Sequence, residues 1–113
     1  MLKIRKYDIQ LTRGDSAYIT LGITDNSGAP IEITGNDVIR CQVREAPNGG
    51  TVIFSGVIER DDEIVWHIRP VDTAAVAAKD YYWDAEIEFS NGDIFSFVPV
   101  SKFTVLPEVT EVS

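Results

Sequence analysis

The sequence contains only one cysteine and one histidine, and each scarcity excludes a class of protein. One cysteine cannot form an internal disulfide, so we do not expect a disulfide-stapled scaffold. One histidine is too few for a histidine-rich metal site. No apolar run approaches the roughly 18 residues that cross a membrane, and none follows the cations near the N-terminus. We therefore expect neither a membrane span nor a signal peptide.

Positive charge is also scarce. The chain has 10 lysines and arginines against 18 aspartates and glutamates, which gives a net charge of −8. Nucleic acids and anionic membranes bind clustered cations, so neither is expected as a partner. A length of 113 residues with 44% hydrophobic residues is typical of one folded domain. We expect a single domain over residues 1–113, made in the cytoplasm, with a loose tail at residues 108–113.

Four stretches alternate apolar and polar residues, which predicts strands with one buried face. They are residues 17–24, 39–44, 64–69 and 81–89. Weaker strand candidates are residues 7–12, 51–59, 94–98 and 102–106. Turn-forming residues separate these stretches, among them residues 26–28, 61–62 and 91–92. Many short strands with frequent turns predict an antiparallel sandwich or a small barrel.

One turn signal predicts a specific pairing. Asn91-Gly92 lies between two strand-like stretches, and this dipeptide favours a tight hairpin because both turn positions need positive φ. We expect residues 81–90 and 93–98 to pair through it.

Residues 70–78 break the alternation. They begin with proline and are rich in alanine, which predicts one or two helical turns that cross between the sheets. Asp72 or Thr73 can cap this helix through a side-chain oxygen. Tyr81 and Tyr82 follow at the start of a strand. This order resembles a tyrosine corner, in which a phenol oxygen bonds to the backbone upstream.

The sequence offers few groups for catalysis. His67 falls on the polar side of its strand, so we expect it at the surface or a rim. Cys41 falls in the apolar register, which favours a buried and inert thiol. A nucleophile elbow, a glycine-rich phosphate loop, paired cysteines and a zinc-binding helix motif are all missing from the sequence. We therefore expect no enzyme activity, no catalytic residue, no cofactor and no metal.

A row of carboxylates is the clearest surface feature. Asp84, Glu86 and Glu88 lie on one strand face, about 7 Å apart in sequence order. A glycosidase or a Ca²⁺ site could use such a row, but the solvated face of a sheet also explains it. Tyr82 and Phe97 could lie outside the core. We expect these five residues to mark a surface that contacts a partner.

Other side chains fall into two expected groups. The remaining large aromatic residues are expected in the core: Trp66, Tyr81, Trp83, Phe89 and Phe103. Scattered arginines could form charge pairs with a neighbouring protein: Arg40, Arg44, Arg60 and Arg69.

The order of motifs resembles the Ig-like domain of tailed-phage structural proteins, the group typified by the N-terminal domain of the phage baseplate upper protein. The similarity covers about residues 8–110. It is carried by residues 11–15, 24–35, 68–75, 81–87, 91–93 and 103–110. The sequence departs from the family pattern at Asp80 and at Ser101-Lys102, where the family often has glycine.

This resemblance implies an Ig-like antiparallel β-sandwich of seven to nine strands with one short helical crossover. It also implies a non-enzymatic structural or adaptor role in a phage or prophage particle, as a baseplate, tail, neck or head component. The expected partners are other virion proteins and further copies of the chain. The alternative is a carbohydrate-binding sandwich, with Ca²⁺ assisting. Exposed aromatic rings beside carboxylates would favour it.

Overall fold

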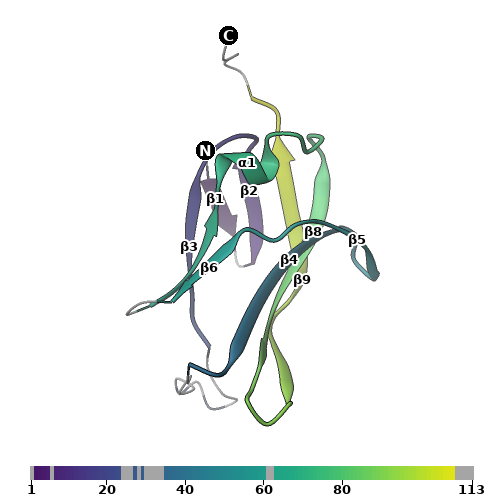
Figure 1. The fold of residues 1–113 in the computed structure, drawn as a ribbon. Coiled ribbons are helices and arrows are strands. Elements are labelled where there is room, and N and C mark those ends of the chain that lie inside the picture. Colours follow the sequence, from purple (N-terminus) through teal and green to yellow (C-terminus); the bar gives the residue numbers. More distant parts are fainter. Residues whose placement is uncertain are drawn as a thin grey trace.

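The computed structural model describes residues 2–5, 7–23, 27, 29, 35–60 and 63–108, and these form a two-layer β-sandwich (Figure 1). The large sheet has the order β1 (Leu2–Arg5), β2 (Asp8–Thr12), β9 (Ile94–Leu106), β8 (Asp80–Glu88), β4 (Val38–Ala46), β5 (Gly49–Phe54). The small sheet has the order β3 (Ala17–Leu21), β7 (Ile64–Ile68), β6 (Val57–Arg60). One short helix, α1 (Pro70–Thr73), lies at one end of the sandwich, and the β8–β9 hairpin extends from the other (Figure 1).

This strand order is that of an Ig-like sandwich, as expected. In that fold strands B, E and D form one sheet, while C, F and G form the other. Here β3, β7 and β6 take the first set of positions, and β4, β8 and β9 take the second. All pairs are antiparallel except one, because β2 runs parallel to β9 with Ile9 opposite Phe103.

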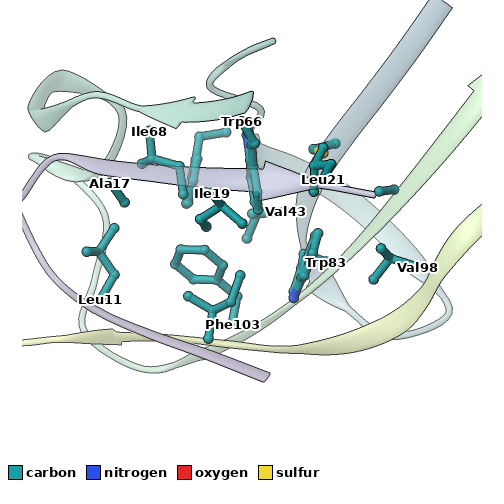
Figure 2. Packing of buried hydrophobic residues seen from close by; sticks show 14 of the residues in the cluster. Leu11, Ala17, Ile19, Leu21, Val43, Trp66, Ile68, Trp83, Val98 and Phe103 are labelled. Carbon is teal, nitrogen blue, oxygen red and sulfur yellow. The ribbon is translucent and has the colours of Figure 1, made fainter. Parts of the chain in front are cut away.

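The alternation seen in the sequence places the core. On β8 the burial pattern alternates strictly, with Tyr81, Trp83, Ala85 and Ile87 inside. β3 and β4 follow the same rule, with Ile19 among the buried residues. Because side chains on a strand point alternately to its two faces, the inner faces of both sheets join in one apolar cluster (Figure 2).

Two tryptophans connect the sheets at the centre of this cluster. Trp66 belongs to β7 in the small sheet, and Trp83 belongs to β8 in the large sheet. Their rings stack with centroids 4.9 Å apart and planes 27° apart, and Phe103 meets the Trp66 ring edge-on at 6.0 Å (Figure 2). Each indole N–H also donates a hydrogen bond of 2.8 Å, Trp66 to the Ser55 carbonyl and Trp83 to the Tyr7 carbonyl. The pair therefore fills the core without leaving a buried polar group unpaired.

The expected strand over residues 51–59 is wrong, because the chain changes sheets there. β5 ends at Phe54 in the large sheet, and β6 begins at Val57 in the small one. Gly56 makes the change possible with φ of +62°. A Cβ atom at this position would lie 2.8 Å from the His67 carbonyl oxygen and from the Trp66 Nε1 atom. Only glycine fits without a shift in the core tryptophan.

The expected hairpin between residues 81–90 and 93–98 is present. Its connection differs from a two-residue turn, because the Phe89 N–H bonds to the Asp93 carbonyl and the Gly92 N–H to the Phe89 carbonyl. This gives a three-residue loop with Gly92 at φ of +94°. The two strands expected over residues 94–98 and 102–106 form one strand, β9, whose register shifts twice against β8 around Pro99.

The crossover from the small to the large sheet is helical, as expected, and the Asp72 carboxylate helps to cap it from the third helical position. Arg69 is the N-cap residue, and its N–H donates to the Asp72 carboxylate at 2.7 Å. Thr73 is buried instead, and its hydroxyl accepts a hydrogen bond from the Gly14 N–H. The expected tyrosine corner is formed by Tyr81, whose hydroxyl donates to a backbone carbonyl four residues upstream at 2.7 Å.

Some expectations concern residues that the structure does not describe. They are residues 26 and 28 of one expected turn, the turn at residues 61–62, and residues 109–113 of the loose tail. Glu108, the first tail residue, is described and lies 3.4 Å from the Arg13 guanidinium. Within the described part of the chain, no helix has the length and apolar character needed to cross a lipid bilayer.

We predict that Trp66→Ala and Trp83→Ala each lower the free energy of unfolding by roughly 3–5 kcal/mol, because each leaves a large cavity between the sheets. Urea denaturation followed by circular dichroism measures the change. Val71→Ala is the control, since the Val71 side chain is 71% exposed and its loss should cost little. A loss below about 1 kcal/mol for either tryptophan variant contradicts this packing.

Candidate functional site

The outer face of the large sheet gathers most of the candidate contact residues. Strand alternation on β8 buries every second side chain and turns the others outward. The neighbouring strand β4 is paired so that Arg40 lies opposite Glu86 and Gln42 opposite Asp84. We call this surface the polar sheet face, and it consists of Arg40, Gln42, Arg44, Tyr82, Asp84, Glu86 and Glu88.

One arginine pairs with two of the three carboxylates in the row on this face. The Arg40 guanidinium donates to Glu86 at 3.3 Å and to Glu88 at 2.7 Å. Asp84 has no ion pair within the described part of the chain. The row therefore does not act as a block of three negative charges, and Asp84 is its available carboxylate.

A shallow pocket of about 290 Å³ lies at the Asp84 end of this face. Tyr82 and Asp84 line it from β8, and Arg44 lines it from β4. The Arg44 guanidinium is held in place, because it donates to Gln42 at 2.6 Å and to the Gly50 carbonyl at 2.9 Å. The site thus presents an aromatic ring, a fixed cation and a carboxylate side by side.

Phe97 lies elsewhere, so the structure does not unite all five candidate residues. It is half-buried on β9 and lines a separate groove of about 270 Å³. Ile19 and Leu21 of β3 form one side of this groove, and Phe95 lies beside Phe97 on the other. Residue type alone could not separate Phe97 from Tyr82. The register shifts in β9 decide which way Phe97 points, whereas Tyr82 follows the regular alternation of β8.

The four arginines expected to pair with a neighbour all bond within the chain. Arg40 and Arg44 act on the polar sheet face, as described above. Arg60 donates to the Asp37 carbonyl at 2.6 Å, and Arg69 pairs with Asp72 at 2.9 Å. Sequence reasoning missed Arg40 and Arg44 as site residues. Their position four residues apart, on the same face of an alternating strand, was the available signal.

The single histidine and the single cysteine belong to different sheets and have different surroundings. Cys41 faces the core from the large sheet. His67 belongs to the small sheet, accepts or donates a 2.8 Å hydrogen bond with Glu59, and stacks on Tyr18 with centroids 4.2 Å apart. They do not form a nucleophile–base pair. Among the described residues, no three histidine, cysteine, aspartate or glutamate side chains form a group that could hold a metal ion.

Most of the large aromatic side chains are buried in the core and so cannot contact a ligand. Trp66, Tyr81, Trp83 and Phe103 are buried, as expected, and Phe89 packs against the core from a half-buried position. Tyr18 is different, because 62% of its side chain is exposed on the outer face of the small sheet. This ring was not singled out from the sequence, where it alternates with core residues like any solvent-side position.

Comparison of the chain with protein-family models finds no match, and comparison with curated proteins finds none either.

Burial raises the pKa of the Cys41 thiol from its ordinary 9.0 to about 12, and the charge of Asp84 adds to this effect. The neutral thiol is therefore favoured in the folded chain. We predict that Cys41 resists alkylation by iodoacetamide at pH 8 and reacts rapidly once urea unfolds the protein, as mass spectrometry would show. Fast labelling of the folded protein would contradict the burial of this side chain.

The raised pKa of Cys41 also makes the free energy of unfolding depend on pH. Between pH 9 and about 12 the unfolded chain releases the thiol proton while the folded chain keeps it. The contribution of Cys41 to stability is therefore complete below pH 9 and decreases as the pH rises. Cys41→Ala lacks this component, so its unfolding free energy should fall less steeply over this range. Equal slopes for the two proteins would contradict the shift.

Proposed function

We propose that the chain is a non-enzymatic structural or adaptor protein of a phage or prophage particle, and that it acts by binding other virion proteins and further copies of itself. The order and spacing of its sequence motifs support the particle assignment. The Ig-like sandwich is compatible with it, since such folds serve many functions and the site must carry the argument.

The polar sheet face carries this proposal. Both of its arginines are already held by partners within the chain: Arg40 by two glutamates and Arg44 by Gln42 and a backbone carbonyl. Fixed side chains lose little rotational freedom when a partner binds, so more of the contact energy becomes affinity. Tyrosine and arginine are also enriched in protein interfaces, and Tyr82 and Arg44 line the same shallow pocket.

The chemistry of the pocket indicates what the partner places there. Asp84 accepts hydrogen bonds and favours a lysine, an arginine or an N–H donor. Val100, half exposed on β9, adds an apolar contact beside Tyr82. A protein segment with one cation flanked by apolar side chains fits this set better than a nucleic acid would, because the chain is strongly acidic.

The experiment is to ask whether the chain is a particle component and whether this face holds it there. Particles purified on a density gradient from the host that encodes the chain should contain it in a fixed stoichiometry by quantitative mass spectrometry. Tyr82→Ala combined with Asp84→Arg should reduce incorporation roughly tenfold, which corresponds to about 1.4 kcal/mol of lost binding.

Val71→Ala serves as the control, since this exposed residue on α1 does not belong to the polar sheet face. Its incorporation should equal that of the wild type. Particles that lack the wild-type chain would refute the virion role. Full incorporation of the folded double variant would refute the role of the polar sheet face.

A second candidate function, sugar binding, is favoured by one observation. Tyr18 exposes its ring on the small sheet, supported by the stacked His67, and Glu59 lies within hydrogen-bond distance of that histidine. An aromatic face next to a carboxylate can receive the apolar face and a hydroxyl of a sugar ring.

A glycan array tests this candidate. Binding to a defined glycan that is lost in Tyr18→Ala and kept in Val57→Ala would support it, because Val57 is also exposed on the small sheet but carries no ring. An array without signal from the wild-type protein would exclude it for the glycans displayed.

A further inference from the structure

β3 is an edge strand that has a partner on one side only. It pairs with β7, and no described strand of the small sheet lies on its other side. In the Ig-like fold strand A occupies that position. Here the N-terminal strands β1 and β2 both belong to the large sheet. The outer edge of β3 therefore presents backbone N–H and carbonyl groups that can pair with another strand.

This edge lacks the features that normally prevent such pairing. No charged residue occurs between Asp15 and Asp25, although a quarter of the chain is charged. The pairing of β3 with β7 is regular throughout, so no bulge twists the edge away. β3 also contains no proline. A flat, uncharged edge strand is a template for strand addition.

The other edge strands of the sandwich carry charged residues or irregular pairing that β3 lacks. β6, the opposite edge of the small sheet, exposes Glu59 and Arg60. β5 contains two glycines and two register shifts against β4. The sequence of β1 includes Lys3 and Arg5. Charges and bulges are the usual means of keeping edges unpaired, so β3 is the unprotected edge among the described strands.

A groove lined mainly by apolar side chains adjoins β3. Ile19 and Leu21 of β3 line one side, while Phe95 and Phe97 of β9 line the other. Phe95 remains 37% exposed there. Strand addition at β3 would cover part of this groove, which adds apolar burial to the new backbone hydrogen bonds.

We propose that the occupant is β3 of a second copy, added antiparallel about a twofold axis. An isologous contact requires a strand that is complementary to itself, and full overlap of the five residues places Ile19 on the axis. Tyr18 of each copy then lies opposite Thr20 of the other on the outer face. Ala17 lies opposite Leu21 on the inner face.

The charge distribution favours a second copy at this position. Two chains of net charge −8 repel each other, and the repulsion is weakest where the contact surface carries no charge. The uncharged stretch around β3 is such a surface. A seam of five residues is about 17 Å long, which is short for a stable interface, so the dimer should be weak and dependent on protein concentration.

This inference rests on the self-association in the proposed function, and it is tested with two matched double variants. Tyr18→Lys with Thr20→Lys places like charges opposite each other twice across the seam. Tyr18→Glu with Thr20→Lys places opposite charges there instead. Both variants remove the Tyr18 ring from His67, so they differ only in whether residue 18 is positively or negatively charged.

Sedimentation equilibrium of the wild type should show a monomer–dimer equilibrium. The dilysine variant should raise the dissociation constant at least about tenfold, and the glutamate–lysine variant should keep the dimer. Circular dichroism checks that both variants are folded. Amide exchange of the wild type should show greater protection of β3 at high protein concentration than at low concentration.

A wild-type protein that stays monomeric at all concentrations overturns the proposal. So does a dimer that the dilysine variant leaves unchanged, since the contact would then lie elsewhere. Measuring incorporation into particles distinguishes failure of the β3 dimer from failure of the proposed adaptor role. A dilysine variant that is monomeric in solution but still incorporated leaves the adaptor role intact, whereas loss of the wild type from particles removes that role whatever the dimer does.

Discussion

The stack of Trp66 on Trp83 joins the two layers of this sandwich, and the rest of the structure depends on it. Antibody domains connect the same two sheets with a disulfide, which one cysteine cannot form. Here two indole rings at 4.9 Å provide the contact, with Phe103 against them. Their N–H groups bond to carbonyls near strand ends, so the same residues that fill the core also position the connections around it.

Because the core closes through these rings, the outward surfaces need not contribute to folding. The polar sheet face holds its charges by internal pairs and leaves Asp84 available beside Tyr82. The small sheet ends in the uncharged edge of β3. These two surfaces lie on different sheets, so a particle component could contact a copy of itself with one and a different protein with the other. Acidic residues elsewhere on the surface limit unspecific contacts.

Alternation predicted the strands that have one regular buried face, such as β4 with Cys41 and β8 with Trp83. It failed where apolar residues continue across a change of sheet. Residues 51–59 read as one strand because the change depends on the φ of Gly56, which the pattern does not record. The site was predictable only in part. Asp84 and its neighbours follow from β8 alone, but the role of Arg40 depends on the register between β4 and β8.

The central physical claim is that the two tryptophans stabilise the fold together rather than as separate fillers of the core. A double-mutant cycle measures this directly, with unfolding free energies of the wild type, Trp66→Ala, Trp83→Ala and the double variant. Stacked rings predict a coupling energy of about 1 kcal/mol, so that the double variant loses less than the sum of the single losses. Additive losses would show that the rings do not interact, and would contradict this account of how the sheets are joined.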